Sequence, residues 1–433
     1  MKSLTRISRP ALMGTVLSTL LLPLVPGAVA AQSQPVVAPD AHCRDYPDSA
    51  LVTFADPDLE TVVREALALN TQQPLTCEVA SRLTELIVPT RIERVVYGGT
   101  LRPSPDRPFE DLAGIQNLTG LTSLSIINRL VTDIGPLAEL TNLQLLNLHT
   151  NWISDIGPLR GLTNLTELII SENPIEDLGL LSELTKLTRL QVHGLYPYQL
   201  QHYLAFDDGR DPNVVFNGVD DLSPLSGLTE LRHLRVHLQN ISDLEPLRGL
   251  TKLTHLRLYG NRIVDTSPLN GMTRLKLLWL HDNRISDIHA LSEMTDMIKL
   301  GLNGNAISDI GPLAGMTQLE ALFLSDNRIS DLTPLSGLSN LTVLRLENNL
   351  LGDLHPLAGL TNLRELGLAR NEAIYDVSPL LANRGLGPGD ELDLRFTYTP
   401  CQAMDDFASK GINLLRVTAL NGSACPGRRL EDP

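Results

Sequence analysis

Residues 275–296, LKLLWLHDNRISDIHALSEMTD, decide the fold of this chain because their pattern returns along most of its length. Units of the form LxxLxLxxNxISDIxPLxxLTx follow one another every 22 residues. They begin at Leu121, Leu143, Leu165, Leu187, Leu231, Leu253, Leu275, Met297, Leu319, Leu341 and Leu363. A fixed period of this length indicates an array of structural repeats.

Two periods, not one, separate Leu187 from Leu231. The stretch 209–230 lacks the first leucines of the unit, but Asn217, Val219 and Asp221 stay in register. We therefore predict a degenerate repeat here and not an inserted loop.

Each half of the unit has a structural role. The LxL alternation predicts a short strand with one buried face. An asparagine at the ninth position can hydrogen-bond backbone groups where the strand turns. The SDIxPL half predicts a capped turn of 3₁₀ or helical backbone. Since no unit can bury its apolar face alone, neighbouring units are expected to stack, with parallel strands along one concave wall.

The formal net charge of −15 has a largely architectural source. One aspartate recurs at the turn position of the units: Asp111, Asp133, Asp155, Asp177, Asp221, Asp243, Asp265, Asp287, Asp309, Asp331, Asp353 and Asp376. The acidity argues against a nucleic acid as the partner.

Residues 1–30 are predicted to be a signal peptide. Lys2, Arg6 and Arg9 precede an apolar stretch at 11–25, and Ala28-Val29-Ala30 fits a cleavage site. No second long apolar run follows, so we expect no membrane span in the mature chain. The prediction is an exported, monomeric protein that is secreted or periplasmic.

All four cysteines flank the repeats, as expected for a protein with disulfides in an oxidising compartment. Three pairings are open. We favour Cys43 with Cys77 and Cys401 with Cys425, because each pair lies within one terminal segment.

The terminal segments are predicted to cap the array. An extension at 31–53 precedes a helical cap and an irregular first repeat at 54–110, with Asp56 as N-cap, Pro57 at the first helical position, and an apolar face that includes Ala66. The repeats span 111–385, a C-terminal capping segment spans 386–425 with a helix from about 402 to 410, and a tail spans 426–433.

The unit NxISDIxPLxxLT resembles the bacterial leucine-rich repeats of the internalin-like type. The N-terminal FADPDLETVVREAL and the segment 386–417 resemble the caps of such exported proteins. The resemblance implies an α/β leucine-rich repeat solenoid, right-handed and curved, with a parallel sheet on the concave face, short 3₁₀ turns on the convex face and helical caps. It also implies a non-enzymatic binding scaffold, often for proteins. Arg129, Gln239 and Thr397 depart from the pattern where asparagine is usual.

Outward positions of the strands are the third, fifth and seventh of each unit, and they carry the predicted partner-binding residues. These are His233, Arg235, His237, His255, Arg257, Tyr259, Trp279, His281, Phe323 and Arg345. Arginine and aromatic residues dominate interface energetics, which favours a contact surface. The alternative is that strand positions simply favour aromatic residues and that arginines extend over neighbouring rings.

We predict no metal site among the histidines. His149, His193, His237 and His281 share one column, and in alternate repeats they would lie roughly 9 to 10 Å apart, too far to share one ion. Only His233 and His255 are predicted to be neighbours. The histidines could instead change binding between about pH 5 and 7.

Tyr196, Tyr198, Tyr203 and Phe206 form a second aromatic segment. They are either a protruding binding flap or fillers of the space that missing leucines leave.

The sequence carries no nucleophile elbow, zinc-protease or phosphate-binding motif, so we predict neither catalytic residues nor a cofactor. Two binding hypotheses remain. The concave wall binds a protein, or it binds envelope or extracellular polysaccharide by stacking sugars on Trp279 and Tyr259.

Overall fold

The computed structural model describes residues 34–88, 111–194 and 218–415. From Pro35 onward the described residues belong to one compact unit. The predicted signal peptide, the aromatic segment at 196–206, Cys425 and the tail lie outside the described residues. Within the described residues, no helix combines the length and the apolar character that a membrane span needs.

Strands of three or four residues recur once per unit and pair in parallel. The large sheet consists of β3 (Glu85–Val88), β4 (Ser123–Ile126), β5 (Leu145–Asn147), β6 (Glu167–Ile169), β7 (Arg189–Gln191), β8 (His233–Arg235), β9 (His255–Arg257), β10 (Leu277–Trp279), β11 (Lys299–Gly301), β12 (Ala321–Phe323), β13 (Val343–Arg345), β14 (Glu365–Gly367), β15 (Glu391–Asp393) and the two-residue β16 (Asn413–Leu414). Each strand pairs with the next one in the chain, from β3 to β16. The array is the leucine-rich repeat solenoid that the period predicts.

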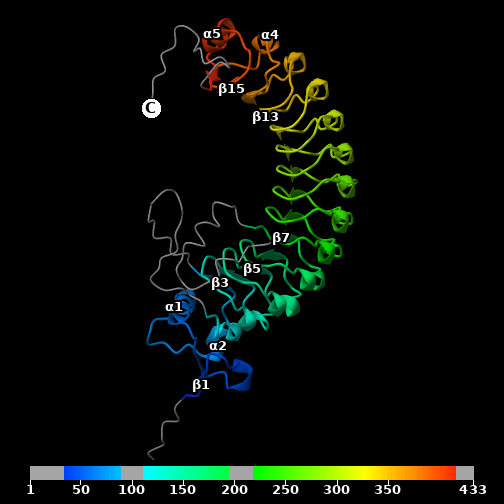
Figure 1. Cartoon of the computed structure of the whole chain (residues 1–433). Coiled ribbons are helices and arrows are strands. Elements are labelled where there is room, and N and C mark those ends of the chain that lie inside the picture. Colours follow the sequence, from blue (N-terminus) through cyan, green and yellow to red (C-terminus); the bar gives the residue numbers. More distant parts are fainter. Residues whose placement is uncertain (1–33, 89–110, 195–217, 416–433) are drawn as a thin grey trace, which may run out of the picture. The chain divides into compact units, whose positions relative to one another are not determined.

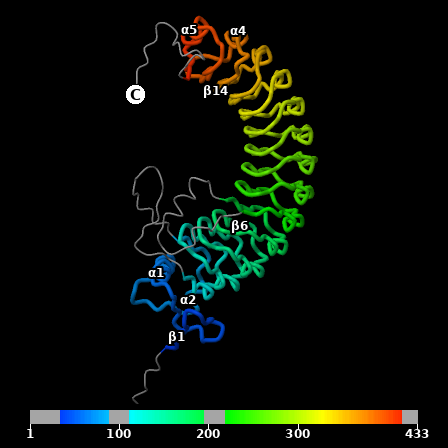
Figure 2. The backbone as a smooth tube through the Cα atoms, in the orientation of Figure 1, coloured from blue at the N-terminus to red at the C-terminus, as the bar shows by residue number. Residues whose placement is uncertain are grey.

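Turns of 3₁₀ helix occupy the opposite side of the array from the strands (Figure 1). They are η2 (Ile115–Asn117), η3 (Gly135–Leu137), η4 (Gly157–Gly161), η5 (Gly179–Glu183), η6 (Ser223–Leu225), η7 (Glu245–Leu247), η8 (Ser267–Leu269), η9 (His289–Leu291), η10 (Gly311–Leu313), η11 (Thr333–Leu335) and η12 (His355–Leu357). In the following unit an α-helix, α4 (Ser378–Ala382), takes this place. The backbone makes one coil per unit (Figure 2).

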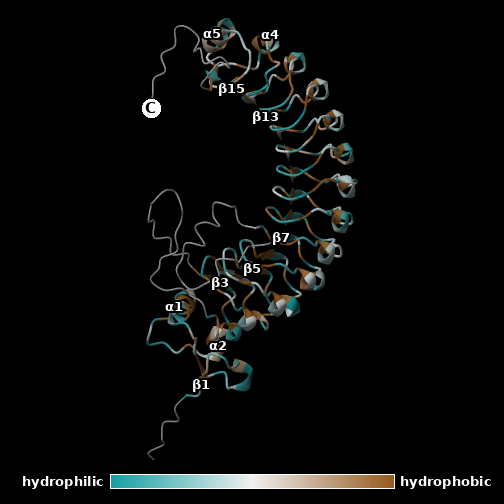
Figure 3. Cartoon of the chain, in the orientation of Figure 1, coloured by the Kyte–Doolittle hydropathy of each residue, from teal (hydrophilic) through white to brown (hydrophobic). Residues whose placement is uncertain are grey.

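Leucines fill the space between the strands and the turns. In the unit at 275–296, Leu275, Leu278, Leu280, Ile285 and Leu291 have no exposed surface. Hydrophobic and hydrophilic stretches recur in successive coils (Figure 3). The core is one continuous aliphatic column, because each unit buries its apolar face against the next.

The predicted roles of asparagine and aspartate are confirmed. Asn151 Nδ2 donates to the carbonyl oxygens of Ile126 and Leu148, and its Oδ1 accepts from Val131 N. All twelve turn aspartates accept a hydrogen bond from the backbone N–H two residues later, as Asp133 does from Gly135 at 2.7 Å. Their carboxylates are thus committed to the turns.

Two of the departures from asparagine take over part of its role. Gln239 Nε2 donates to Val192 O at 3.2 Å, and Thr397 Oγ1 donates to Leu394 O at 2.8 Å. The residue before the ninth position has left-handed backbone in many units, with φ from 55° to 58° at Thr150, Asp282 and Arg370 and 65° at Gly260. This turn reverses the chain immediately after each strand.

The N-terminal cap begins earlier than the sequence predicts. β1 (Val36–Val37) and β2 (Leu51–Val52) pair in parallel, and Cys43 in η1 (Cys43–Asp45) is disulfide-bonded to Cys77 in α2 (Cys77–Ala80). The extension is therefore folded, and the first predicted disulfide is confirmed. The second lies outside the described residues at Cys425 and stays a prediction.

A helix at each end covers the core. In α1 (Pro57–Ala66), Asp56 Oδ1 accepts from the amides of Asp58 and Leu59, which confirms the predicted cap, and Leu59 is buried. Ala66, which we placed on the apolar face, is exposed. In α5 (Cys401–Ser409), Met404 and Phe407 close the other end as predicted.

The prediction of a separate degenerate repeat at 209–230 is wrong. β7 pairs directly with β8, so no further strand separates these two in the sheet. η6 (Ser223–Leu225) packs against η5 (Gly179–Glu183), the turn of the preceding unit, so η6 is the turn of the unit that begins with β7. One unit therefore spans both periods. Asn217 itself lies outside the described residues. Val219 and Asp221 keep the 22-residue spacing because they belong to the second half of this long unit, which made a separate repeat look present.

Candidate partner-binding site

The outward residues of β8 to β13 form continuous columns across the sheet. In the middle column Arg235 lies in register with Arg257, and Arg257 with Trp279. Gly301 separates Trp279 from Phe323, and Arg345 follows Phe323. Parallel pairing places neighbours in a column about 4.8 Å apart at the backbone, so their side chains can touch.

The direct pairing of β7 with β8 also changes the arrangement of the histidines. His193 and His237 belong to neighbouring units, and their rings stack with centroids 4.3 Å apart. Our prediction that they occupy alternate repeats is wrong, because β7 and β8 are neighbours in the sheet. His233 and His255, with centroids 4.5 Å apart, are neighbours as predicted.

A line of aromatic rings in contact with one another runs across the sheet, and we call it the ring ladder. Its members are His149, His193, His237, Tyr259, His281, Trp279 and Phe323. Tyr259 is sandwiched between His237 and His281, with centroid distances of 4.0 and 4.2 Å. Trp279 meets His281 edge to face at 5.6 Å and Phe323 at 5.3 Å.

The centre of the ring ladder is buried. Tyr259 is 9% exposed and His237 only 4% exposed, and the Tyr259 hydroxyl lies 3.3 Å from His237 Nε2. We had treated Tyr259 as an outward contact residue, but His237 and His281 cover both faces of its ring. Within the described residues, His237 Nδ1, His281 Nδ1 and Trp279 Nε1 are buried without a hydrogen-bond partner.

Burial keeps the histidines of this surface neutral. It lowers the pKa of His193 to about 4 and that of His237 to about 2, with smaller contributions from neighbouring positive charges. Burial, then His255 and Arg189, lowers the pKa of His233 to about 4. Titration of these three rings therefore falls below the range of pH 5 to 7 that we predicted from the unperturbed imidazole.

Arginines of the middle column differ in their partners. Arg235 Nη1 donates to the neutral Gln191 Oε1 at 3.1 Å, and Arg257 has no hydrogen bond or ion pair among the described residues. Arg345 forms ion pairs with Glu365 at 2.8 Å and Glu347 at 3.5 Å. The charge of Arg345 is therefore paired, although Arg345 lies next to Phe323 in the middle column. Phe323 in turn contacts Trp279.

Gly301 provides the surface on which the Trp279 indole rests. A Cβ atom at this position would lie 2.2 Å from Trp279 Cε3, so the indole rests on the glycine backbone. The signal was present in the sequence, because a glycine at an outward strand position leaves space for a large neighbour. Among the described residues, no group of three His, Cys, Asp or Glu side chains could hold a metal ion.

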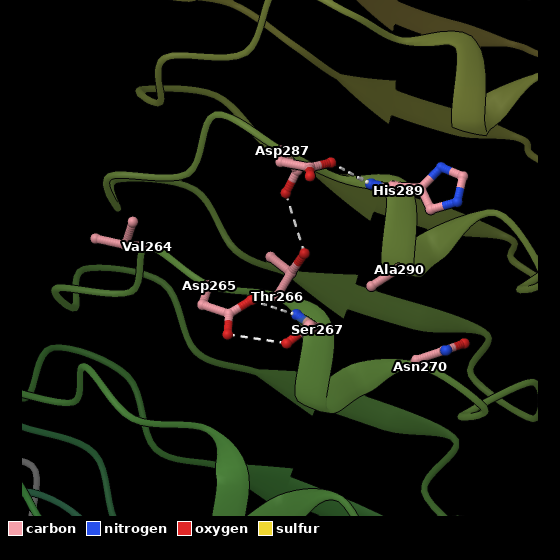
Figure 4. Close-up of a pocket in the computed structure, with 8 residues that line it drawn as sticks. All are labelled: Val264, Asp265, Thr266, Ser267, Asn270, Asp287, His289 and Ala290. Atoms are coloured by element: carbon pink, nitrogen blue, oxygen red, sulfur yellow. Dashed lines mark hydrogen bonds between the residues drawn. The ribbon is translucent and has the colours of Figure 1, made fainter.

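A small hollow lies on the other side of the array, next to η8 and η9 (Figure 4). It encloses about 200 Å³ and is lined by Val264, Asp265, Thr266, Ser267, Asn270, Asp287, His289 and Ala290. Asp265 and Asp287 accept backbone amides of their own turns, and Thr266 Oγ1 donates to Asp287 O. These polar groups already form hydrogen bonds within the turns, so few of them remain to bind a ligand.

Comparisons with known proteins agree with this architecture. A family model described as Leucine Rich repeats (2 copies) matches residues 251–293 and 295–337. No curated protein sequence matches the chain. An internalin, InlF, from Listeria monocytogenes is 28% identical, with a TM-score of 0.70 over 85% of this chain and 95% of that one.

More distant solved structures share the fold. A leucine-rich repeat protein of Leptospira interrogans is 18% identical, with a TM-score of 0.57 over 71% of this chain and 74% of its own. A plant peptide hormone receptor, RGFR1, in complex with RGF2 is 18% identical, with a TM-score of 0.54 over 70% of this chain and 48% of its own. The period, the parallel sheet, the asparagine hydrogen bonds and the likeness to InlF together identify the chain as an internalin-like leucine-rich repeat protein.

Proposed function

We propose that this protein is an exported, non-catalytic scaffold that binds a protein partner on the strand face between β8 and β12. The observation that carries the proposal is the ring ladder, in which the half-buried Trp279 lies between His281 and Phe323. Framework residues repeat in every unit, but these rings do not, so the solenoid alone does not require them. Half-buried tryptophan and arginine side chains on a rigid surface are typical of binding hot spots.

Several observations support a protein partner over a polysaccharide. Sugars stack on an open aromatic face, but both faces of Tyr259 are covered within the ring ladder. One side of Trp279 rests on Gly301. A flat surface with one indole anchor and nearby guanidinium groups suits a protein better than an extended glycan. Leucine-rich repeat proteins act as protein-binding scaffolds, and the RGFR1 structure holds its partner RGF2.

Export is supported by the disulfide between Cys43 and Cys77, because such bonds persist in oxidising compartments. The aromatic segment 196–206 is a second candidate contact region, on the sequence argument alone. We further propose that the protein acts as a monomer.

Affinity capture from culture medium and envelope extract tests the proposal. The wild type is compared with Trp279→Ala and with a control, Leu350→Ala, since Leu350 is 62% exposed and lies outside the ring ladder. We expect Trp279→Ala to reduce capture at least tenfold and Leu350→Ala to retain it. Equal capture by all three proteins would reject this surface, and capture abolished by glycosidase but not by protease would favour the polysaccharide.

A further inference from the structure

Arg235 and Arg257, which we call the arginine pair, are adjacent like charges on the strand face. They lie in register on β8 and β9, and both are partly buried. Because neighbouring strands lie about 4.8 Å apart, the two guanidinium groups are close to each other. Like charges placed directly across a strand pair are destabilising, so the arrangement has a cost within the protein itself.

The other strand arginines, Arg189 and Arg345, have carboxylate partners, as does Arg395 shortly after β15. Arg189 lies 3.5 Å from Glu167, Arg345 lies 2.8 Å from Glu365, and Arg395 lies 2.6 Å from Asp393. The arginine pair lacks such a partner within the described residues, where only Gln191 accepts from Arg235. The exception is notable in a chain with a net charge of −15, in which carboxylates are abundant.

The surroundings confirm that positive charge is concentrated here. Burial, then Arg257 and Arg189, lowers the pKa of Arg235. After burial, charges of the arginine pair also contribute to the lowered pKa values of His193, His237 and His255. Asp282 acts in the opposite direction on the pKa of His281. A bound anion would relieve this repulsion, whereas a metal cation would add to it.

Trp279 follows Arg257 directly in the same column. The site thus combines two guanidinium groups that have no carboxylate partner among the described residues with an apolar anchor beside the ring ladder. Guanidinium groups bind carboxylates through paired hydrogen bonds. We propose that the arginine pair binds a carboxylate of an acidic peptide segment in the partner protein, while Trp279 packs against an apolar side chain of that segment. The inference rests on the proposed function and specifies the chemistry of the partner.

The test uses a displayed library of random dodecapeptides as the probe. Clones that bind the wild type and not Trp279→Ala are sequenced, and representative peptides are measured by fluorescence anisotropy. We expect Asp or Glu to be enriched in these clones. The variant Arg235→Gln/Arg257→Gln should weaken peptide binding by about 30-fold or more, as expected when two partly buried charges that contact a ligand are removed. Replacing the acidic residues of a peptide by amides should have a similar effect.

Arg262→Gln/Arg284→Gln is the matched control, because it removes the same charge from exposed residues of β9 and β10 units outside the strands. This control should change affinity less than about threefold, since exposed charges are screened. If the double variant of the arginine pair does not fold, Arg257→Gln alone replaces it, because Arg257 makes no hydrogen bond within the described residues.

Contrary outcomes separate the two proposals. Clones that depend on Trp279 but lack acidic residues, or that bind the arginine variant equally well, would overturn the inference and leave the proposed function standing. An absence of clones that depend on Trp279 would reject both. Tighter binding of polygalacturonate than of any peptide, lost in the arginine variant, would replace the acidic peptide by a polysaccharide.

Discussion

Asn261 illustrates how single residues hold neighbouring repeats together. Its Nδ2 donates to Val236 O at 2.9 Å and to Leu258 O at 2.8 Å, and its Oδ1 accepts from Ile241 N at 3.0 Å. The side chain is 8% exposed, so water cannot easily replace these bonds. A buried backbone group that loses its partner costs about 1 to 3 kcal/mol.

Replacing Asn261 by alanine should therefore lower the free energy of unfolding by about 2 to 4 kcal/mol. Urea unfolding followed by circular dichroism measures the change. Asn270→Ala is the control, because Asn270 is exposed and its side chain makes no hydrogen bond with the described residues. Equal stability of the two variants would show that the buried amide bonds do not hold the turns.

Mutation of Gly301 tests its contact with the Trp279 indole. In Gly301→Ala the new Cβ would lie 2.2 Å from the indole, so the ring must move, at a cost of about 1 to 3 kcal/mol. We expect a shifted emission maximum in a Trp152→Phe background, in which Trp279 is the remaining tryptophan, and weaker partner binding. Gly337→Ala is the control, because nothing lies within 4 Å of its added Cβ. An unchanged emission spectrum for Gly301→Ala would contradict this contact.

Strand pairing produces the ring ladder, because it places side chains of neighbouring strands in contact. Parallel strands repeat at about 4.8 Å, close to the 4.0 Å at which His237 and Tyr259 stack. Stacking covers the ring faces, and burial then keeps the imidazoles uncharged. His237 is surrounded by His193, Arg257, Arg235 and His281, all of which oppose its protonation.

Stability should fall in acid for this reason. The folded-state pKa values of His193 and His237, about 4 and about 2, lie below the unperturbed value of 6.5, so the unfolded chain takes up protons first. Their contribution is fully present above pH 6.5 and is lost as the pH falls toward the folded-state values. The expected slope is about 1.4 kcal/mol per pH unit for each ring between about pH 6 and pH 4.

Urea unfolding at pH 7, 5 and 4 measures this slope. The variant His193→Phe/His237→Phe keeps aromatic rings in the ring ladder, and its free energy of unfolding should depend less on pH. His289→Gln, on the outer turn η9, should leave it unchanged. A wild type with the same pH profile as the double variant would contradict the assignment to these rings.

At the scale of the whole molecule, each unit contacts only its neighbours, so the two ends need caps. The N-terminal cap is held by the disulfide between Cys43 and Cys77, whose Cα atoms lie 5.6 Å apart. Cys43 N also donates to Asn117 Oδ1, which ties the cap to the first turn. Stability in such an array is local, and damage at one end need not reach the other.

Cys43→Ser/Cys77→Ser should destabilise the cap by about 3 to 4 kcal/mol in the chain-entropy model, for a sequence separation of 34 residues. Hydrogen exchange should accelerate in β1, β2 and α1, while β10 to β13 keep their protection. The distant strands are the internal control. Uniform loss of protection along the array would show that it unfolds as a single cooperative unit.

Most of the fold is predictable because the same residues recur. The columns of outward residues from β8 to β13 are also readable from the period, and the structure keeps their register. What could not be predicted is how these side chains pair. Arg345 stands in the same column as Arg257 but meets Glu365 and Glu347, and Tyr259 is enclosed by its neighbours.

The period by itself determined the solenoid, its core leucines and its asparagine hydrogen bonds, because each follows from local patterning that every unit repeats. The capping helices followed from separate helix signals in the two terminal segments. Only the tertiary structure decided that β7 pairs with β8 across 42 residues, from Gln191 to His233, and so joined His193 to His237. Register in a stack depends on which strands become neighbours in space. A spacing of two periods fits both one long unit and two short ones.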